Sequence, residues 1–196
     1  YEAVEDVRRT VGKYCGNEYH LTGQSVINYD LKDTITGDYL PVTLASIIAI
    51  GLILVITFRS VSIPLILLLT IEGAIWLNLG LPYFTGDSLN YIGYQIISAV
   101  QLGATVDYGI LFVKRYMDSR ADMNCREACY NAITGTAASI LAPAAILTLA
   151  GVTLGIVSTN GIISQLGTIL GRGAAISAAM VLLFLPALLM MTMMVQ

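Results

Sequence analysis

Five stretches of the sequence are long and apolar enough to cross a lipid bilayer. Crossing about 30 Å of hydrocarbon takes about 20 apolar residues at a rise of about 1.5 Å each. The stretches cover residues 40–58, 62–81, 91–113, 132–156 and 162–190. Only 12% of the residues are charged, whereas soluble domains carry about 25%. The sequence therefore predicts an all-α membrane protein with a five-helix transmembrane bundle over residues 39–196.

The distribution of basic residues predicts the orientation of these helices. Lysines and arginines are enriched in short cytoplasmic loops. The two loops at residues 82–90 and 155–161 contain none. The opposite ends of the spans carry Arg59, Lys114, Arg115, Arg120 and Arg126. We therefore expect a multi-pass protein of the cell membrane with residues 1–38 outside the cytoplasm and the C-terminus inside it.

Residues 1–38 have a different, partly charged pattern. Valines three or four positions apart within residues 2–13 predict an amphipathic helix. Residues 18–22 predict one short strand, and residues 27–35 a second helix that runs into the membrane. A single strand has no partner to pair with. We therefore expect a partial α/β extracytoplasmic segment that belongs to a longer protein.

Three ionisable residues fall inside the predicted spans: Glu72, Asp107 and Arg172. Each costs about 2.5 to 3.5 kcal/mol in a membrane unless it is paired, neutralised or hydrated, so a functional role is the first hypothesis for it. Helical rise places Asp107 about 10 Å from the cytoplasmic boundary and the other two about 15 Å from the outer boundary. A structural ion pair between Glu72 and Arg172 is therefore an open alternative to a functional role. For Asp107 the alternative is a protonated carboxyl that only joins helices.

The third span carries polar residues on two different sides. One side is a stripe within about 80° of arc at 100° per residue, made of Tyr94, Ser98, Gln101, Thr105 and Tyr108. Asp107 projects about 100° away from Tyr108, toward Gly103 and Ile110. A helix that is polar on two sides cannot face lipid on either. This span must therefore be central, and because four other helices can hardly surround it, we expect a second bundle from missing sequence or from another chain.

Glycines four residues apart occur in the fourth and fifth spans, at Gly151 and Gly155 and at Gly167 and Gly171. Small residues at this spacing allow two membrane helices to approach closely.

The sequence offers little support for several other classes of function. His20 is the only histidine and there are three cysteines, so we expect no metal centre and no cofactor. The charged residues form no basic patch of the kind that binds nucleic acid. An intramembrane aspartyl protease needs two adjacent carboxyl groups, and Glu72 and Asp107 differ by about 10 Å in depth. An enzyme is therefore not expected, and a plain assembly subunit without chemistry is a further alternative.

The run Gly103-Ala104-Thr105-Val106-Asp107-Tyr108-Gly109-Ile110, followed by Lys114-Arg115-Tyr116, resembles the fourth transmembrane helix of the resistance-nodulation-division (RND) superfamily, and most of all its MMPL branch. Residues 57–60 with Pro64 are similar to the turn between that family's second and third helices. Residues 185–189 are similar to the end of its sixth helix. The resemblance implies the end of a porter domain at residues 1–38, followed by helices two to six of one half of an RND-type membrane domain.

The resemblance also implies a function: a proton-driven exporter of lipid or other hydrophobic substrates, with Asp107 exchanging protons and Tyr108 as its relay partner. The polar stripe, Glu72 and Arg172 would then be intramembrane polar support; the family pattern assigns no role to the last two. The implied partners are protons, a hydrophobic substrate, membrane lipids and a second half or second copy. A sterol-sensing domain has the same five-helix unit, so a lipid sensor without transport is the alternative.

Overall fold

The computed structural model describes residues 2–15, 19–86 and 91–193. The chain divides into two compact units, Tyr1–Leu44 and Ala45–Gln196. The long helix α2 (Gln24–Phe58) contributes its first part to one unit and its last part to the other.

The first unit contains α1 (Glu2–Cys15) and the beginning of α2. The Arg8 guanidinium donates to both carboxylate oxygens of Asp30 at 2.7 Å, and the Tyr19 hydroxyl donates to the Arg8 carbonyl at 2.8 Å. The ion pair between Arg8 and Asp30 joins α1 to α2. Helix α1 matches the predicted amphipathic helix, and the beginning of α2 matches the predicted helix that leads into the first span.

The strand expected at residues 18–22 is not observed. Within the described part of that segment, residues 19–22, the backbone is irregular, and residue 18 lies outside the described residues. Tyr19 instead packs against α1. A Cβ added at Gly12 would lie 3.4 to 3.9 Å from atoms of the Tyr19 side chain. The structure therefore supplies no α/β segment among the residues it describes.

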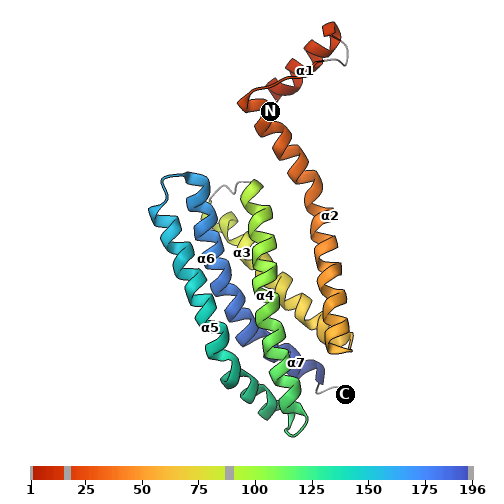
Figure 1. Ribbon diagram of the computed structural model, residues 1–196, viewed down its shortest axis with the longest axis vertical. Coiled ribbons are helices and arrows are strands. Elements are labelled where there is room, and N and C mark those ends of the chain that lie inside the picture. Colours follow the sequence, from red (N-terminus) through yellow and green to blue (C-terminus); the bar gives the residue numbers. More distant parts are fainter. Residues whose placement is uncertain (1, 16–18, 87–90, 194–196) are drawn as a thin grey trace. The chain divides into compact units, whose positions relative to one another are not determined.

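The second unit contains the transmembrane bundle, and the successive long helices after α2 alternate in direction (Figure 1). Among the described residues, five helical segments are long and apolar enough to cross a membrane, as predicted. After the end of α2 they are built from α3 (Ser62–Thr85), α4 (Tyr91–Arg120), α5 (Cys125–Val157), α6 (Gly161–Ala179), the π-helical turn η1 (Met180–Phe184) and α7 (Leu185–Met193). The last three together make the fifth span.

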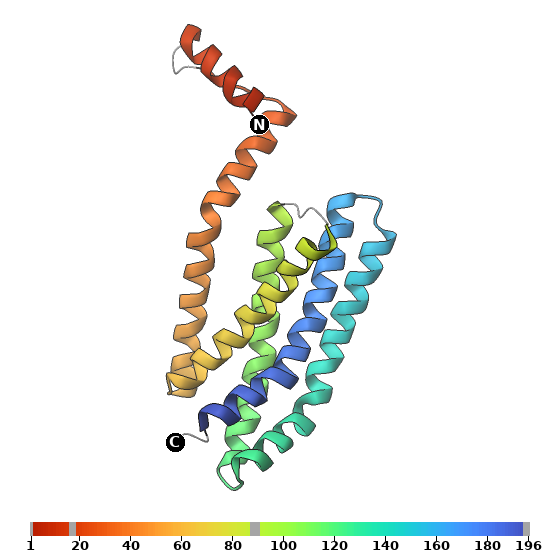
Figure 2. The same cartoon turned by 180° about the vertical axis from the view of Figure 1, so that it is seen from behind.

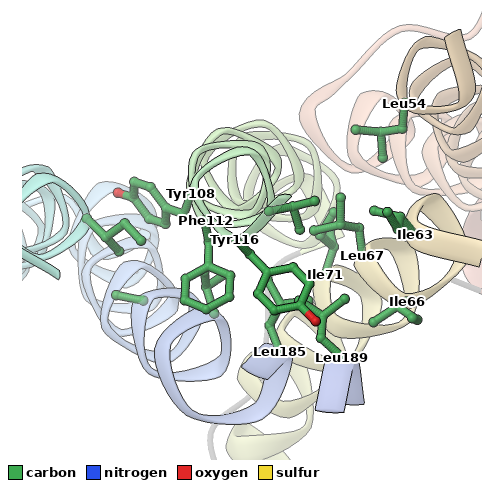
Figure 3. Close-up of a cluster of buried hydrophobic side chains, with 14 of the residues drawn as sticks. Leu54, Ile63, Ile66, Leu67, Ile71, Tyr108, Phe112, Tyr116, Leu185 and Leu189 are labelled. Atoms are coloured by element: carbon green, nitrogen blue, oxygen red, sulfur yellow. The ribbon is translucent and has the colours of Figure 1, made fainter. Parts of the chain in front are cut away.

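Helix α3 runs obliquely across α4 and the helix formed by α6 and α7 (Figure 2). At Gly109 of α4, an added Cβ would lie 2.6 Å from the Leu67 side chain of α3. On the same side of α4, Phe112 and Tyr116 are fully buried against Leu185 and Leu189 (Figure 3). Each of these buried side chains adds dispersion contacts, so the cluster stabilises the half of the bundle that contains the C-terminal end of α4.

Helices α5 and α6 form the most extensive helix pair in the bundle. A Cβ added at Gly151 would lie 2.5 Å from the Gly167 carbonyl and 2.6 Å from the Gly171 backbone nitrogen. A Cβ added at Gly167 would lie 3.0 Å from the Gly155 nitrogen. The four glycines therefore let the two backbones touch, which confirms the close contact predicted from their spacing.

Two irregular backbone positions shape the remaining connections. The tight turn between α2 and α3 places Arg59 in the left-handed region, at φ 49°. Near the end of the fifth span, the π turn Met180–Phe184 ends two residues before Pro186. Proline has no N–H and its ring clashes with the carbonyl four residues earlier, so regular α-helical bonding cannot continue through it.

Candidate functional site

Helix α4 turns the predicted polar stripe into the bundle. Ser98, Gln101 and Thr105 are buried, with Thr105 fully so. Tyr94 is half-buried and packs against the hydrophobic core, and Tyr108 is 8% exposed within that core. The structure therefore brings all five stripe residues to one side of α4, where they face other helices of the same bundle.

The stripe binds polar groups on α3 and α6. The Gln101 side-chain amide donates to the Ala74 carbonyl at 3.1 Å and to the Ser177 hydroxyl at 3.2 Å. Its Oε1 accepts a 2.8 Å hydrogen bond from the Asn78 amide. A 2.7 Å hydrogen bond joins the hydroxyls of Thr105 and Ser177. Gln101 is therefore the centre of a buried network that ties three helices together.

Gly173 makes this network possible. A Cβ at position 173 would lie 2.5 Å from Asn78 Nδ2 and 2.8 Å from Gln101 Oε1. Any larger residue would have to push the two amides apart or force α6 away from α3 and α4. The three helices can meet at the network only because this position of α6 has no side chain.

Arg172 joins the network through Asn78. Its Nε donates to Asn78 Oδ1 and its Nη2 donates to the Asn78 main-chain carbonyl, both at 2.9 Å. The Asn78 amide also donates to the Ile169 carbonyl at 3.1 Å. Asn78 therefore uses its amide and its carbonyl groups to connect Arg172, α6 and Gln101.

The suggested ion pair between Glu72 and Arg172 is not formed. Among the described residues, no ion pair joins Glu72 to Arg172, and Glu72 is half-buried on α3. Residue number places the two side chains at the same depth, but it does not give the direction in which each one points around its helix. Asn78, six residues after Glu72 on α3, binds the guanidinium instead.

Asp107 lies on the opposite side of α4 from the network and is exposed in this chain. The residues that share this side are also exposed, namely Ile96, Ala99, Val100, Gly103, Leu111 and Lys114. We call this set, with Asp107, the open face of α4. An added Cβ at Gly103 meets no described atom within 4 Å. Asp107 and Tyr108, although adjacent in sequence, therefore point to different surroundings within this chain.

Sequence reasoning did not single out Asn78 and Ser177, which complete the network. Both are neutral residues within apolar helices, and such residues often bond only to their own backbone. Asn78 is the stronger signal of the two, because an asparagine side chain has four hydrogen-bonding sites to satisfy in a membrane span. No pattern along α6 predicts that Ser177 faces α4.

Comparison with known proteins identifies the family of this chain. Its sequence matches the model of the MMPL family over residues 1–193. The chain belongs to the MMPL family. It is therefore a multi-pass membrane protein with the helices of an MMPL membrane domain.

Relatives of this MMPL chain include proteins of Streptomyces coelicolor and Mycobacterium tuberculosis. A Streptomyces coelicolor protein, named as a membrane protein, SCO0839, is 26% identical over 197 residues, which cover 97% of this chain and 28% of the relative. The Mycobacterium tuberculosis protein MmpL1, named as a probable transport protein, is 30% identical over 155 residues, which cover 76% of this chain and 16% of the relative. The MMPL chain thus spans less than a third of the length of these relatives.

Proposed function

We propose that the protein carrying this chain is a transporter driven by the proton-motive force, and that it exports lipid or other hydrophobic molecules. The observation that carries the proposal is the position of Asp107: an ionisable residue midway along the open face of a membrane-spanning helix. Membership of the MMPL family and the name of the relative MmpL1 support a role in transport.

Asp107 acts as the proton carrier in this proposal. A carboxylate in the membrane costs several kcal/mol, and protonation removes its charge. Its neighbours on the open face, Val100, Gly103 and Leu111, are apolar, so the protonated form fits against another apolar helix better than the charged form does. Exchange of the proton would therefore change how tightly this face packs.

A second bundle, from the other part of the protein or from a second copy, covers the open face in this proposal. The inner side of α4 is held by Gln101 and Thr105, which makes α4 a rigid support for Asp107. A rigid helix passes a change in packing at Asp107 to the rest of the bundle. One proton crossing a potential of 100 mV supplies about 2.3 kcal/mol for this movement.

Tyr108 assists the transfer as a relay residue. It adjoins Asp107 along the helix, and its ring is buried in the core. A phenolic hydroxyl both donates and accepts a hydrogen bond, so Tyr108 passes the proton in this proposal through water that connects its hydroxyl to the carboxyl group. Tyr108→Phe is expected to slow export without stopping it.

The substitution Asp107→Asn tests the proposal. The full-length protein would be produced in cells, and export of a fluorescent lipid analogue would be followed with and without an imposed proton gradient. We expect gradient-driven export to fall at least tenfold in Asp107→Asn, with unchanged amounts of protein in the membrane. The matched control is Asp118→Asn, which removes an exposed carboxyl three turns further along the same helix.

Gradient-driven export that survives in Asp107→Asn would remove the proposal. Binding of the lipid analogue by the same two variants distinguishes a transporter from a lipid sensor built on these five helices. A sensor would bind the lipid analogue to the same extent with and without the gradient, and Asp107→Asn would not change that binding.

A further inference from the structure

One side of α3 carries a carboxyl group and an indole ring near the middle of the membrane span. Leu65, Leu69, Glu72 and Trp76 recur at spacings of four, three and four residues, which places them on one face of the helix. Glu72 is half-buried, whereas Trp76 is 71% exposed and the two leucines are 59% exposed. We call these four residues the Glu72 face. It is an apolar surface that contains one negative charge.

Trp76 lies too deep to belong to an interfacial aromatic belt. Tryptophan and tyrosine in membrane proteins gather at the two membrane–water interfaces. Tyr83 and Phe84 fit such a position, because their rings pack edge to face in the last turn of α3, with centroids 5.7 Å apart. Trp76 comes seven residues before Tyr83, which corresponds to about 10 Å along the helix. Anchoring at the interface therefore does not account for the exposed indole.

Glu72 has neither a hydrogen bond nor an ion pair with any residue that the structure describes. A carboxylate inside a membrane is costly unless it is paired, neutralised or hydrated. Residues 33–58 and 60–113 contain no lysine or arginine, so α3 and the parts of α2 and α4 beside it supply no cation. Arg172 of α6 binds Asn78. Within the described part of the chain, the negative charge on this face is therefore not balanced.

Helix α2 borders the Glu72 face on one side. A Cβ added at Gly51 of α2 would lie 3.4 Å from the Leu68 side chain, so Leu68 packs on α2. Leu68, Glu72 and Trp76 follow one another at steps of about 40° around α3. Glu72 therefore lies between the contact with α2 and the exposed indole. One turn before Gly51, α2 carries the apolar residue Ile47, which adds apolar surface on this side.

We propose that the Glu72 face binds a lipophilic cation, meaning an organic cation with large apolar substituents that reaches the site through the membrane. The Glu72 carboxylate supplies the opposite charge. The Trp76 ring, one turn away, offers a π face of the kind that attracts organic cations within about 6 Å. Leu65 and Leu69 provide apolar contact for the substituents. The site needs no proton exchange at Asp107, so it goes beyond the proposed exporter and does not depend on it.

Asp107 provides a comparison, because it is a second carboxyl group within a membrane-spanning helix. Its surroundings differ from those of Glu72. The adjoining Tyr108 ring is buried in the core, and the next residue along the open face is the aliphatic Leu111. Lys114 follows two turns after Asp107 on the same face and adds a positive charge. We therefore expect Asp107 to contribute nothing to the binding of a lipophilic cation.

Tetraphenylphosphonium and tetraphenylborate are suitable probes, because they have nearly the same size and apolar surface but opposite charge. Binding of each radiolabelled ion to the full chain, purified in neutral detergent, would be measured by equilibrium dialysis. Trp76 is the only tryptophan in the sequence, so quenching of tryptophan fluorescence reports whether a bound ion lies at this face. We expect the phosphonium to bind and to quench Trp76, and the borate to bind at least tenfold more weakly.

Three variants separate the contributions to binding, with folding of each one checked by circular dichroism. Glu72→Gln removes the charge at nearly constant size and should weaken phosphonium binding at least tenfold, without weakening borate binding. Trp76→Phe keeps a ring face and Trp76→Leu does not, so the leucine variant should bind the phosphonium at least threefold more weakly than the phenylalanine variant. Asp107→Asn, the matched control for the loss of a membrane carboxyl, should bind it as the unmodified chain does.

Equal binding of the two ions would overturn the inference. Phosphonium binding that persists in Glu72→Gln, or that is the same in Trp76→Leu and Trp76→Phe, would do so as well. Because Asp107 is not part of this site, the export assay and the binding assay can fail separately. Proton-driven export that survives in Asp107→Asn removes the proposed exporter and leaves the cation site standing, whereas loss of phosphonium binding in Asp107→Asn alone overturns the cation site.

Discussion

Arg172 and Asn78 are joined by two hydrogen bonds, from Nε to the side-chain oxygen and from Nη2 to the main-chain carbonyl, both 2.9 Å long. This pairing places a cation inside a membrane-spanning helix next to a neutral residue of α3. Asn78 is fully buried and also donates to Gln101. The pair therefore links Arg172 of α6 to the network that holds the inner face of α4.

Replacement of Asn78 by leucine should destabilise the bundle. Leucine has a similar size but leaves Gln101 Oε1 and the Arg172 Nε without the partner they have here. Unpaired buried polar groups cost about 1 to 3 kcal/mol each, and more when charged. We expect Asn78→Leu to lower the free energy of unfolding by about 2 to 4 kcal/mol, measured by reversible unfolding in mixed micelles.

Arg172→Gln in the Asn78→Leu background is the control for that interpretation. If Asn78→Leu lowers the free energy of unfolding because the contact with Arg172 is lost, adding Arg172→Gln should cause little further destabilisation. Full additivity of the two effects would show that Asn78 and Arg172 contribute independently.

An alanine at position 173 should disrupt the network by its size alone. The added methyl carbon would lie 2.5 Å from Asn78 Nδ2 and 2.8 Å from Gln101 Oε1. Overpacking of this kind costs about 1 to 3 kcal/mol. Gly80→Ala is the matched control, since a Cβ there meets no described atom within 4 Å. Thermal unfolding should show a lower midpoint for Gly173→Ala and an equal or higher one for Gly80→Ala, because alanine favours helix by up to about 1 kcal/mol.

Gly151→Leu should separate α5 from α6. A Cβ at this position already approaches the Gly167 carbonyl and the Gly171 nitrogen to within 2.6 Å, and backbone atoms cannot move aside as a side chain can. We expect a disulfide crosslink engineered between the two helices to form in the unmodified chain and to fail in Gly151→Leu. Efficient crosslinking in that variant would mean that the glycine contact does not hold the pair together.

The turn at Arg59 should tolerate glycine and reject valine. Its φ of 49° lies in the left-handed region, where β-branched residues are strongly disfavoured and glycine is not. Arg59→Val is expected to lower the free energy of unfolding by about 1 to 2 kcal/mol relative to Arg59→Gly. Both variants remove the same charge, so their difference reports the backbone conformation, again by unfolding in mixed micelles.

The network could be predicted only in part, as Gln101 and Asn78 illustrate. Gln101 was found because it repeats with Ser98 and Thr105 at helical spacing, which is a property of one helix. Asn78 and Ser177 contact Gln101 from other helices, 23 and 76 residues away in the sequence. No local pattern records such a contact, because it depends on how the helices turn about their own axes when they pack.

The sequence by itself determined the five spans and the glycine-lined faces of α5 and α6, because hydrophobic length and small-residue spacing are properties of single helices. It also determined that α4 is polar on two sides. Only the tertiary structure decided that the stripe faces α3 and α6 while Asp107 faces outward, and that Arg172 binds Asn78 rather than Glu72. The physical reason is that depth along a helix follows from residue number, whereas the partner of a buried polar group follows from the crossing of helices distant in sequence.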